Sequence, residues 1–216
     1  MAFTKPPADM VLSPAVWRLP HGAIIWRVHR DAYDSCSFNS RPSHQYFNGA
    51  RFDGTKDDSY AFLYAGCSPP AALAETLVRN ISASDDGLFH ILRRNLDQRM
   101  LSPLVTCRDS QLIDLRQEQG IREVMQDSWL VTAPETEYAQ TRHWGHWIRR
   151  NCPAVEGFVW RSKRHINEDS VVLFGDRCGL DLLAPASTPN PIALDNRAGI
   201  EFINRALESI RCIVEM

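Results

Sequence analysis

Five polar side chains interrupt segments that are otherwise apolar, and they are the strongest candidates for chemistry in this sequence. Arg27 lies inside the apolar run 23–28, and Glu75 lies among alanines and leucines in PAALAETL. Tyr64 ends the run AFLY, Ser162 directly follows GFVW, and Arg51 lies in the motif GARF. Each has a structural explanation when taken alone, such as a snorkelling arginine or a helix glutamate that faces water.

Two other motifs resemble known site patterns, and their spacing argues against both. Segment 49–56, GARFDGTK, has the glycines of a phosphate-binding loop, but Thr55 stands where lysine is required and no helix pattern follows. His143 and His146 are three residues apart and could share a helix face as metal ligands. No third ligand lies at a telling spacing, and the neighbouring tryptophans favour a packed helix. We therefore expect no metal site.

Short blocks around the five residues, in their order and spacing, resemble the RES-domain family of bacterial proteins, named for a shared Arg, Glu and Ser. The resemblance extends from about Trp26 to Arg177. Its blocks are Trp26–Val28, Ala50–Asp53, Leu63–Ser68, Ala71–Thr76, Gly157–Ser162 and Val171–Phe174. The sequence departs from the common pattern at Ala50, Trp160 and Lys163.

The resemblance implies a fold similar to that of ADP-ribosyltransferase toxins, with NAD+ as the substrate. It implies that Arg27 and Arg51 hold the pyrophosphate. Glu75 would stabilise the positive charge that develops on the ribose as nicotinamide leaves, as in glycoside cleavage. Tyr64 would form an aromatic wall for nicotinamide, and Ser162 would orient ribose or phosphate. Because the leaving group is already cationic, we expect no metal and no cofactor, with NAD+ acting as substrate.

The function expected from this resemblance is cleavage of NAD+ at the nicotinamide–ribose bond, by hydrolysis or phosphorolysis, in the toxin of a toxin–antitoxin pair. Two alternatives stay open: a mono-ADP-ribosyltransferase that modifies a host protein, and a non-catalytic RES-like binding module. The intact set of five residues argues against the binding module. The sequence does not identify the acceptor or the antitoxin, and it is compatible with a homo-oligomer.

The apolar patterns predict one α+β domain over residues 23–183, with short mixed or antiparallel strands packed against helices. Strands are expected at 23–28, 61–65, 89–92, 112–115, 157–160 and 170–174, and helices at 69–80, 118–127, 137–151 and 197–213. Ser68 is expected to cap the helix over 69–80. Residues 1–22 are expected to form an irregular lead-in and residues 31–60 a long loop. Residues 184–216 are expected to form a proline-rich linker and a terminal helix packed on the domain.

Composition argues against several function classes. The 24 Lys and Arg residues against 26 Asp and Glu give a net charge of −2, which does not favour a dedicated nucleic-acid binder. No apolar run approaches the roughly 18 residues that span a bilayer, and Lys5 and Asp9 lie where a secretory signal has its apolar core. We therefore expect a cytoplasmic protein without membrane or direct nucleic-acid contact. Its six cysteines form no CxxC pair, so we expect reduced thiols.

Overall fold

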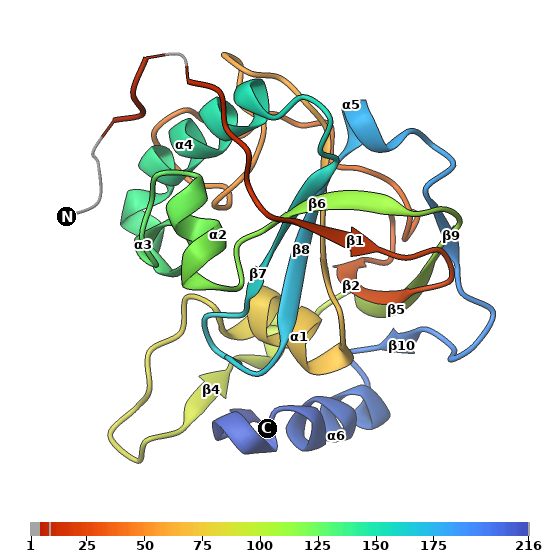
Figure 1. The fold of residues 1–216 in the computed structure, drawn as a ribbon. Coiled ribbons are helices and arrows are strands. Elements are labelled where there is room, and N and C mark those ends of the chain that lie inside the picture. Colours follow the sequence, from red (N-terminus) through yellow and green to blue (C-terminus); the bar gives the residue numbers. More distant parts are fainter. Residues whose placement is uncertain (1–4, 9, 216) are drawn as a thin grey trace.

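A curled sheet lies at the centre of the structure, a computed structural model that describes residues 5–8 and 10–215 (Figure 1). Its strands are β1 (Val16–Leu19), β2 (Ile24–Arg30), β3 (Phe62–Gly66), β5 (Arg99–Thr106), β6 (Ser110–Asp114), β7 (Gly157–Arg161), β8 (Asp169–Phe174), β9 (Leu183–Pro185) and β10 (Ile192–Ala193). They pair in the order β1-β6-β7-β8-β3-β2-β5-β10, and β9 also pairs with β5. Strands β6 and β7 run parallel, whereas the other neighbours run antiparallel.

Helices pack on the sheet in two groups (Figure 1). One group is α2 (Glu118–Glu123), α3 (Trp129–Thr132), η3 (Glu135–Glu137) and α4 (Tyr138–Asn151); the other is α1 (Pro69–Leu73), η1 (Ala74–Val78) and α6 (Arg197–Ala206). The short elements α5 (Gly175–Cys178), η2 (Arg93–Asn95) and η4 (Glu208–Ile210) complete the helices. Strands β4 (Phe89–Ile91) and β11 (Cys212–Val214) form a separate parallel pair. The expected single α+β domain of short strands and helices is confirmed. Among the described residues, no helix is long and apolar enough to cross a membrane.

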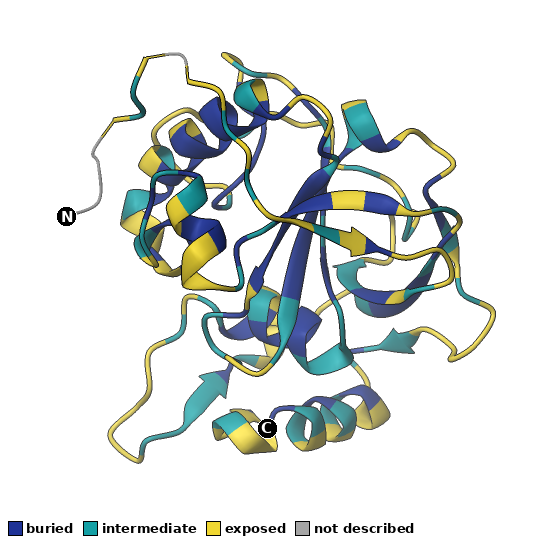
Figure 2. Cartoon of the chain, viewed as in Figure 1, coloured by how far each residue is buried: buried dark blue, intermediate teal, exposed yellow. Residues whose placement is uncertain are grey.

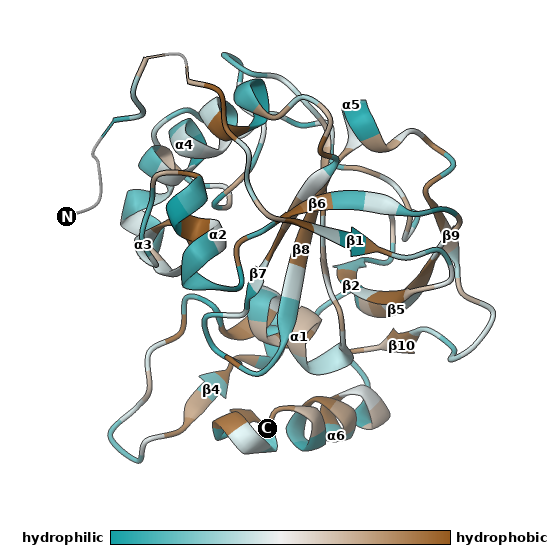
Figure 3. Cartoon of the chain, in the orientation of Figure 1, coloured by the Kyte–Doolittle hydropathy of each residue, from teal (hydrophilic) through white to brown (hydrophobic). Residues whose placement is uncertain are grey.

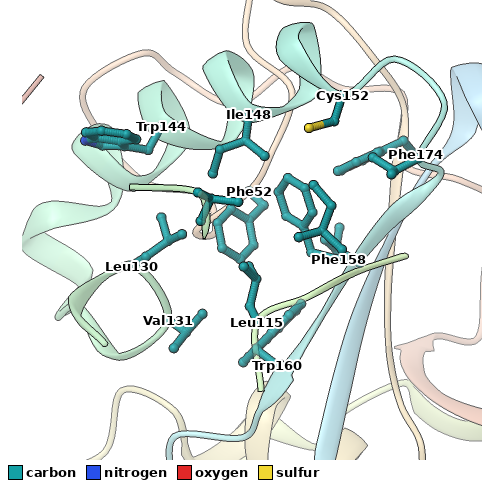
Figure 4. Close-up of a cluster of buried hydrophobic side chains, with 14 of the residues drawn as sticks. Phe52, Leu115, Leu130, Val131, Trp144, Ile148, Cys152, Phe158, Trp160 and Phe174 are labelled. Carbon is teal, nitrogen blue, oxygen red and sulfur yellow. The ribbon is translucent and has the colours of Figure 1, made fainter. Parts of the chain in front are cut away.

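The core cluster beneath α2, α3 and α4 anchors a loop residue. Phe52 comes from the loop before β3, yet its ring is completely buried against Phe158 and Trp160 of β7 (Figure 4). The ring centroids lie 5.0 Å and 5.6 Å apart in edge-to-face arrangements, which aromatic pairs favour. Strands β7 and β8 are buried along most of their length, whereas most exposed residues lie in the outer helices and connecting segments (Figure 2). The core therefore fixes the chain next to Arg51.

The expected helix over 197–213 is shorter than predicted. Helix α6 ends at Ala206, Arg211 takes a left-handed φ of 57°, and β11 then pairs in parallel with β4. The apolar spacing misled because Ile203, Leu207 and Val214 all enter one cluster, although Val214 does so from a strand. Figure 3 shows apolar residues along α6.

Four other segments also differ from expectation. The sequence analysis missed β5, because Pro103 lies in the middle of the strand and prolines are rare there. The expected linker contains β9 and β10, which pair with β5. The helix expected at 118–127 ends at Glu123, and α3 follows it. Of the lead-in expected over 1–22, residues 1–4 and 9 lie outside the described residues, and β1 forms within the rest.

Gly66 lets α1 approach the end of β3. A Cβ atom at this position would lie 2.3 Å from the backbone nitrogen of Ala72. We expect Gly66→Ala to lower the free energy of unfolding by about 3 kcal/mol, because overpacking forces the backbone apart. Gly22→Ala is the control, since its Cβ would have no heavy atom within 4 Å and only its positive φ costs about 1 kcal/mol. Urea unfolding of both variants measures the difference; equal losses would contradict the close approach.

Candidate functional site

Glu75 lies in a distorted turn that the sequence analysis did not foresee. Helix α1 begins as predicted, with the Ser68 hydroxyl accepting a hydrogen bond from the backbone N–H of Ala71 and two prolines following. The chain then continues as the π-helical turn η1, Ala74–Val78. Such turns are rare and often lie at functional sites. The predicted helix over 69–80 therefore forms an α-helix in its first part and a wider π-helical turn at Glu75.

Two groups from the end of β7 bind the same oxygen of Glu75. The Ser162 hydroxyl donates to Oε1 at 2.8 Å, and the backbone N–H of Lys163 donates to Oε1 at 3.0 Å. Ser162 is completely buried. The second oxygen, Oε2, is also buried, and no described group forms a hydrogen bond with it. The structure thus brings Glu75 and Ser162 together across 87 residues and leaves one carboxylate oxygen unpaired.

Arg51 is a buried cation whose donors are mostly unpaired. Its side chain is 1% exposed, and its Nη2 donates to the carbonyl oxygen of Ala133 at 3.3 Å. No described group accepts from Nε or Nη1, which are both buried. The guanidinium carbon lies 5.1 Å from the centroid of the Tyr138 ring. Burial lowers the pKa of Arg51, and the fields of Tyr138 and Glu75 partly oppose that shift.

A second arginine, which the sequence analysis missed, faces the same tyrosine. The guanidinium carbon of Arg79 lies 5.3 Å from the Tyr138 centroid, and its buried Nε has no acceptor among the described residues. Arg79 follows Glu75 by four residues, so helical spacing offered a signal for it. Lys163 adds a third cation, with a pKa lowered by burial and then by Arg164 and Arg51. The charges of Arg51 and Lys163 both interact with that of Glu75.

Tyr64 supports the loop that carries Arg51. Its hydroxyl accepts from the backbone N–H of Phe52 at 2.9 Å and donates to Oδ1 of Asp53 at 3.0 Å. Its ring contacts Trp160 edge-on, with centroids 6.2 Å apart. Burial raises the pKa of Tyr64 well above its usual value, so the hydroxyl keeps its proton and remains a donor.

Arg27 lies apart from the other four predicted residues. Strand side chains alternate between faces, and neighbouring Trp26 packs in the cluster beside α1, whereas Ile25 packs in another cluster. The side chain of Arg27 therefore lies on the face of Ile25. Its Nη1 donates to the carbonyl oxygens of Ser35 at 2.7 Å and Ser37 at 2.5 Å, and burial lowers its pKa to about 10. The expected pair of Arg27 and Arg51 is not formed in this structure.

A cavity of about 480 Å³ is lined by Ser162 and Lys163, the two residues whose hydroxyl and backbone N–H bind Glu75. Its wall includes Ser162 and Lys163 on one side, and Val131 and Thr132, the residues directly before Ala133, on another. The remaining lining residues are Leu115, Arg116, Glu118, Ile121, Arg122, Asp127, Ser128, Arg161 and Ile166. Basic side chains outnumber acidic ones there. Arg116, Arg122 and Arg161 already form ion pairs with acidic residues, so Lys163 is the lining residue that offers its charge to an anionic ligand, and Leu115, Ile121 and Val131 offer apolar contact.

The two histidines considered as metal ligands lie elsewhere, along a second cavity of about 560 Å³ beside α4. A ring nitrogen of His146 forms a 3.0 Å hydrogen bond with the carbonyl oxygen of Asp53. Among residues 5–8 and 10–215, no three histidine, cysteine or acidic side chains are arranged to hold a metal ion.

Comparisons with known proteins identify the fold and the family. No curated protein sequence matches the chain. Among solved structures, the chain is similar to one in the crystal structure of the M. tuberculosis MbcT-MbcA toxin-antitoxin complex, with a TM-score of 0.54 and 13% identity over 81% of this chain and 85% of that chain. At this identity the likeness concerns the fold alone, and it agrees with the expected ADP-ribosyltransferase-like architecture. The RES domain family model matches residues 24–193, a range that includes all five residues singled out from the sequence. The chain belongs to the RES-domain family.

Proposed function

We propose that this chain cleaves NAD+ at the bond between nicotinamide and ribose, and that it acts as the toxin of a toxin–antitoxin pair. The proposal rests on the polar atoms of Glu75, Arg51 and Arg79 that have no hydrogen-bond partner among the described residues. Glu75 has a buried oxygen without a donor, and Arg51 and Arg79 have buried N–H groups without acceptors. Unpaired buried polar groups are costly, so an acceptor and several donors that lack partners among the described residues in one cluster support a ligand with both anionic and cationic parts. NAD+ has both.

In this proposal Glu75 acts on the ribose. Departure of nicotinamide breaks the carbon–nitrogen bond, leaves its electron pair on the nitrogen, and leaves positive charge on the sugar. A carboxylate beside that charge stabilises the transition state more than the ground state, which is the requirement for catalysis. Ser162 and the Lys163 backbone hold Oε1, so Oε2 is the oxygen assigned to the ribose. The hydroxyl of Ser162 acts through Glu75 in this arrangement.

The pyrophosphate is assigned to Arg51 and Arg79. Two guanidinium groups at one tyrosine ring repel each other, and an anion between them removes that repulsion. Arg79 thus takes the part that sequence resemblance gave to Arg27. The Lys163 ammonium adds positive charge beside the same cavity.

The first test is release of nicotinamide by the purified chain. Glu75→Gln preserves the shape of the side chain and removes its charge, so we expect the cleavage rate to fall by about 10²–10³. Chromatography of nicotinamide, with and without phosphate in the buffer, measures the rate and separates hydrolysis from phosphorolysis. Labelling of an added protein by ADP-ribose would instead indicate transferase activity. If Glu75→Gln cleaves NAD+ as fast as the parent, the assignment of Glu75 fails.

The assignment of Arg51 to the pyrophosphate leads to a second prediction. Arg51→Lys should weaken pyrophosphate binding nearly as much as Arg51→Ala, about tenfold or more, because an ammonium cannot make the planar two-bond contact. Calorimetric titration of inorganic pyrophosphate into both variants measures the loss. Arg94→Lys makes the same change at an exposed position of η2 and is the matched control. Parent-like binding by Arg51→Lys would mean that a point charge is sufficient or that Arg51 does not touch the ligand.

An enzyme that drains NAD+ would poison its own host, so we propose that a partner protein covers this cavity. An acidic segment or terminal carboxylate of the partner can pair with Arg51 in place of pyrophosphate. The similar chain comes from a complex described as toxin–antitoxin, which supports a partner of this kind.

We expect Arg51→Ala to weaken binding of the protein encoded next to this chain, and high salt to weaken it further in the parent. Arg27→Ala removes the same charge from a guanidinium that already binds two carbonyl groups, so it should bind the partner as the parent does. Co-purification and titration at low and high salt provide the measurement. Unchanged affinity of Arg51→Ala at both salt concentrations would rule out the covered cavity.

A further inference from the structure

The backbone that carries Arg51 is held by side chains from several parts of the chain. The N–H of Ala50 donates to Asp53 Oδ2 at 2.7 Å, and the N–H of Phe52 donates to the Tyr64 hydroxyl at 2.9 Å. The carbonyl oxygen of Arg51 accepts from the Thr141 hydroxyl at 3.0 Å, and that of Phe52 accepts from the Tyr60 hydroxyl at 2.9 Å. An irregular loop with this many side-chain partners has one defined position.

Arg142 contributes the largest share of these contacts. Its side chain is 1% exposed and extends from α4 to the loop. Nη1 donates to the carbonyl oxygens of Asn48 at 2.8 Å and Ala50 at 3.1 Å. Nη2 donates to those of His44 at 3.0 Å and Gln45 at 3.4 Å. One buried guanidinium therefore binds four carbonyl groups, including the one directly before Arg51.

The loop takes an unusual backbone path that suits these contacts. Asn48 and Gly49 both have positive φ angles, of 53° and 78°. A Cβ atom on Gly49 would lie 2.5 Å from Ser43 Oγ and 2.8 Å from Asp53 Oδ2. Ser43 and Asp53 themselves share a 2.6 Å hydrogen bond. Asp53 therefore accepts hydrogen bonds from Ser43 and from the backbone of Ala50, and Arg142 of α4 donates to the carbonyl groups of the loop.

We infer that Arg142 is a positioning residue for Arg51: by binding the four carbonyl groups of residues 44–50, it fixes the place from which the Arg51 guanidinium reaches the substrate. The guanidinium of Arg142 donates to carbonyl groups of this loop, and Arg142 lines the cavity beside α4 and not the one lined by Ser162 and Lys163, so its effect on Arg51 passes through the loop. This inference rests on the proposed function, because it takes Arg51 to be a ligand of the NAD+ pyrophosphate.

A double-mutant cycle tests the inference. Arg142→Lys keeps a charge but cannot span four carbonyl groups, so we expect the KM for NAD+ to rise about tenfold with kcat unchanged. In an Arg51→Lys background the same change should have no further effect, because the group it positions is already lost. A purely structural role would weaken activity by the same factor in both backgrounds, and that result would overturn the inference. Arg150→Lys, an exposed arginine of the same helix, is the matched control and should match the parent.

A second variant disturbs the loop without touching the buried arginine. Gly49→Ala lies at an exposed position and introduces the two close contacts described above. It should raise KM in the parent and have no effect in the Arg51→Lys background. Thermal unfolding monitors the fold of each variant. A folded Gly49→Ala protein with the parent KM would overturn the inference, even if Arg142→Lys does not fold.

Binding of inorganic pyrophosphate separates this inference from the proposed function. If the parent releases no nicotinamide but binds pyrophosphate, the function fails. The same cycle on the pyrophosphate Kd then tests Arg142. Non-additive losses support the positioning role, and additive losses overturn it. If the parent cleaves NAD+ and the cycle on KM is additive, the inference alone fails.

Discussion

The carboxylate of Glu75 lies in a partly buried place, and the segments around it have to supply its hydrogen bonds. A carboxylate without partners in such a position loses the hydration that stabilises its charge. The end of β7 supplies two donors to Oε1, one from the Ser162 hydroxyl and one from the Lys163 backbone. The π-helical turn that contains Glu75 and the strand end before Ser162 therefore have to keep their relative positions, and the close approach of α1 to β3 at Gly66 helps to hold them.

Arg164 connects the segment after β7 with the residues that follow the π-helical turn. It directly follows Lys163, and its guanidinium donates to the carbonyl oxygens of Arg79 and Ile81. It also lies over the Phe89 ring, 5.0 Å from the centroid. The connection between β7 and β8, which binds Glu75, is thereby joined to the backbone of Arg79 and to β4. Strand β4 in turn pairs with the C-terminal strand β11. The C-terminal segment thus contributes to the site through packing, although none of its residues lines the cavity.

Local sequence patterns predicted the helices and strands of the site better than the hydrogen bonds and charged contacts within it. Ser68 followed by two prolines is a strong helix start, and the cap formed as expected. Only the resemblance placed Glu75 and Ser162 in one site, since no local pattern relates residues 87 positions apart, and the hydrogen bond between them was not predicted. The π turn at Glu75 changes which side chains share its face, and nothing in the run of alanines and leucines announces it. Arg27 misled because one residue along a strand reverses the face, and Trp26 takes the side toward α1.

The role of Arg142 was hidden for a different reason. An arginine in a helix among tryptophans and histidines has no sequence partner when its acceptors are main-chain carbonyl groups almost a hundred residues away. Every residue type offers the same carbonyl, so only the path of the loop can reveal the contact. That path depends on positive φ angles at Asn48 and Gly49. The sequence shows the glycine but not the contacts that require it.

The same contacts leave polar atoms at the site available to a ligand. Glu75 Oε2, Arg51 Nε and Nη1, and Arg79 Nε have no hydrogen-bond partner among the described residues. The backbone beside Arg51 is bound at Ala50, Arg51 and Phe52 by Arg142, Thr141 and Tyr64, and Oε1 of Glu75 is bound by the end of β7. The points from which both side chains extend are therefore fixed before a ligand binds, and less ordering is required of a ligand that satisfies both.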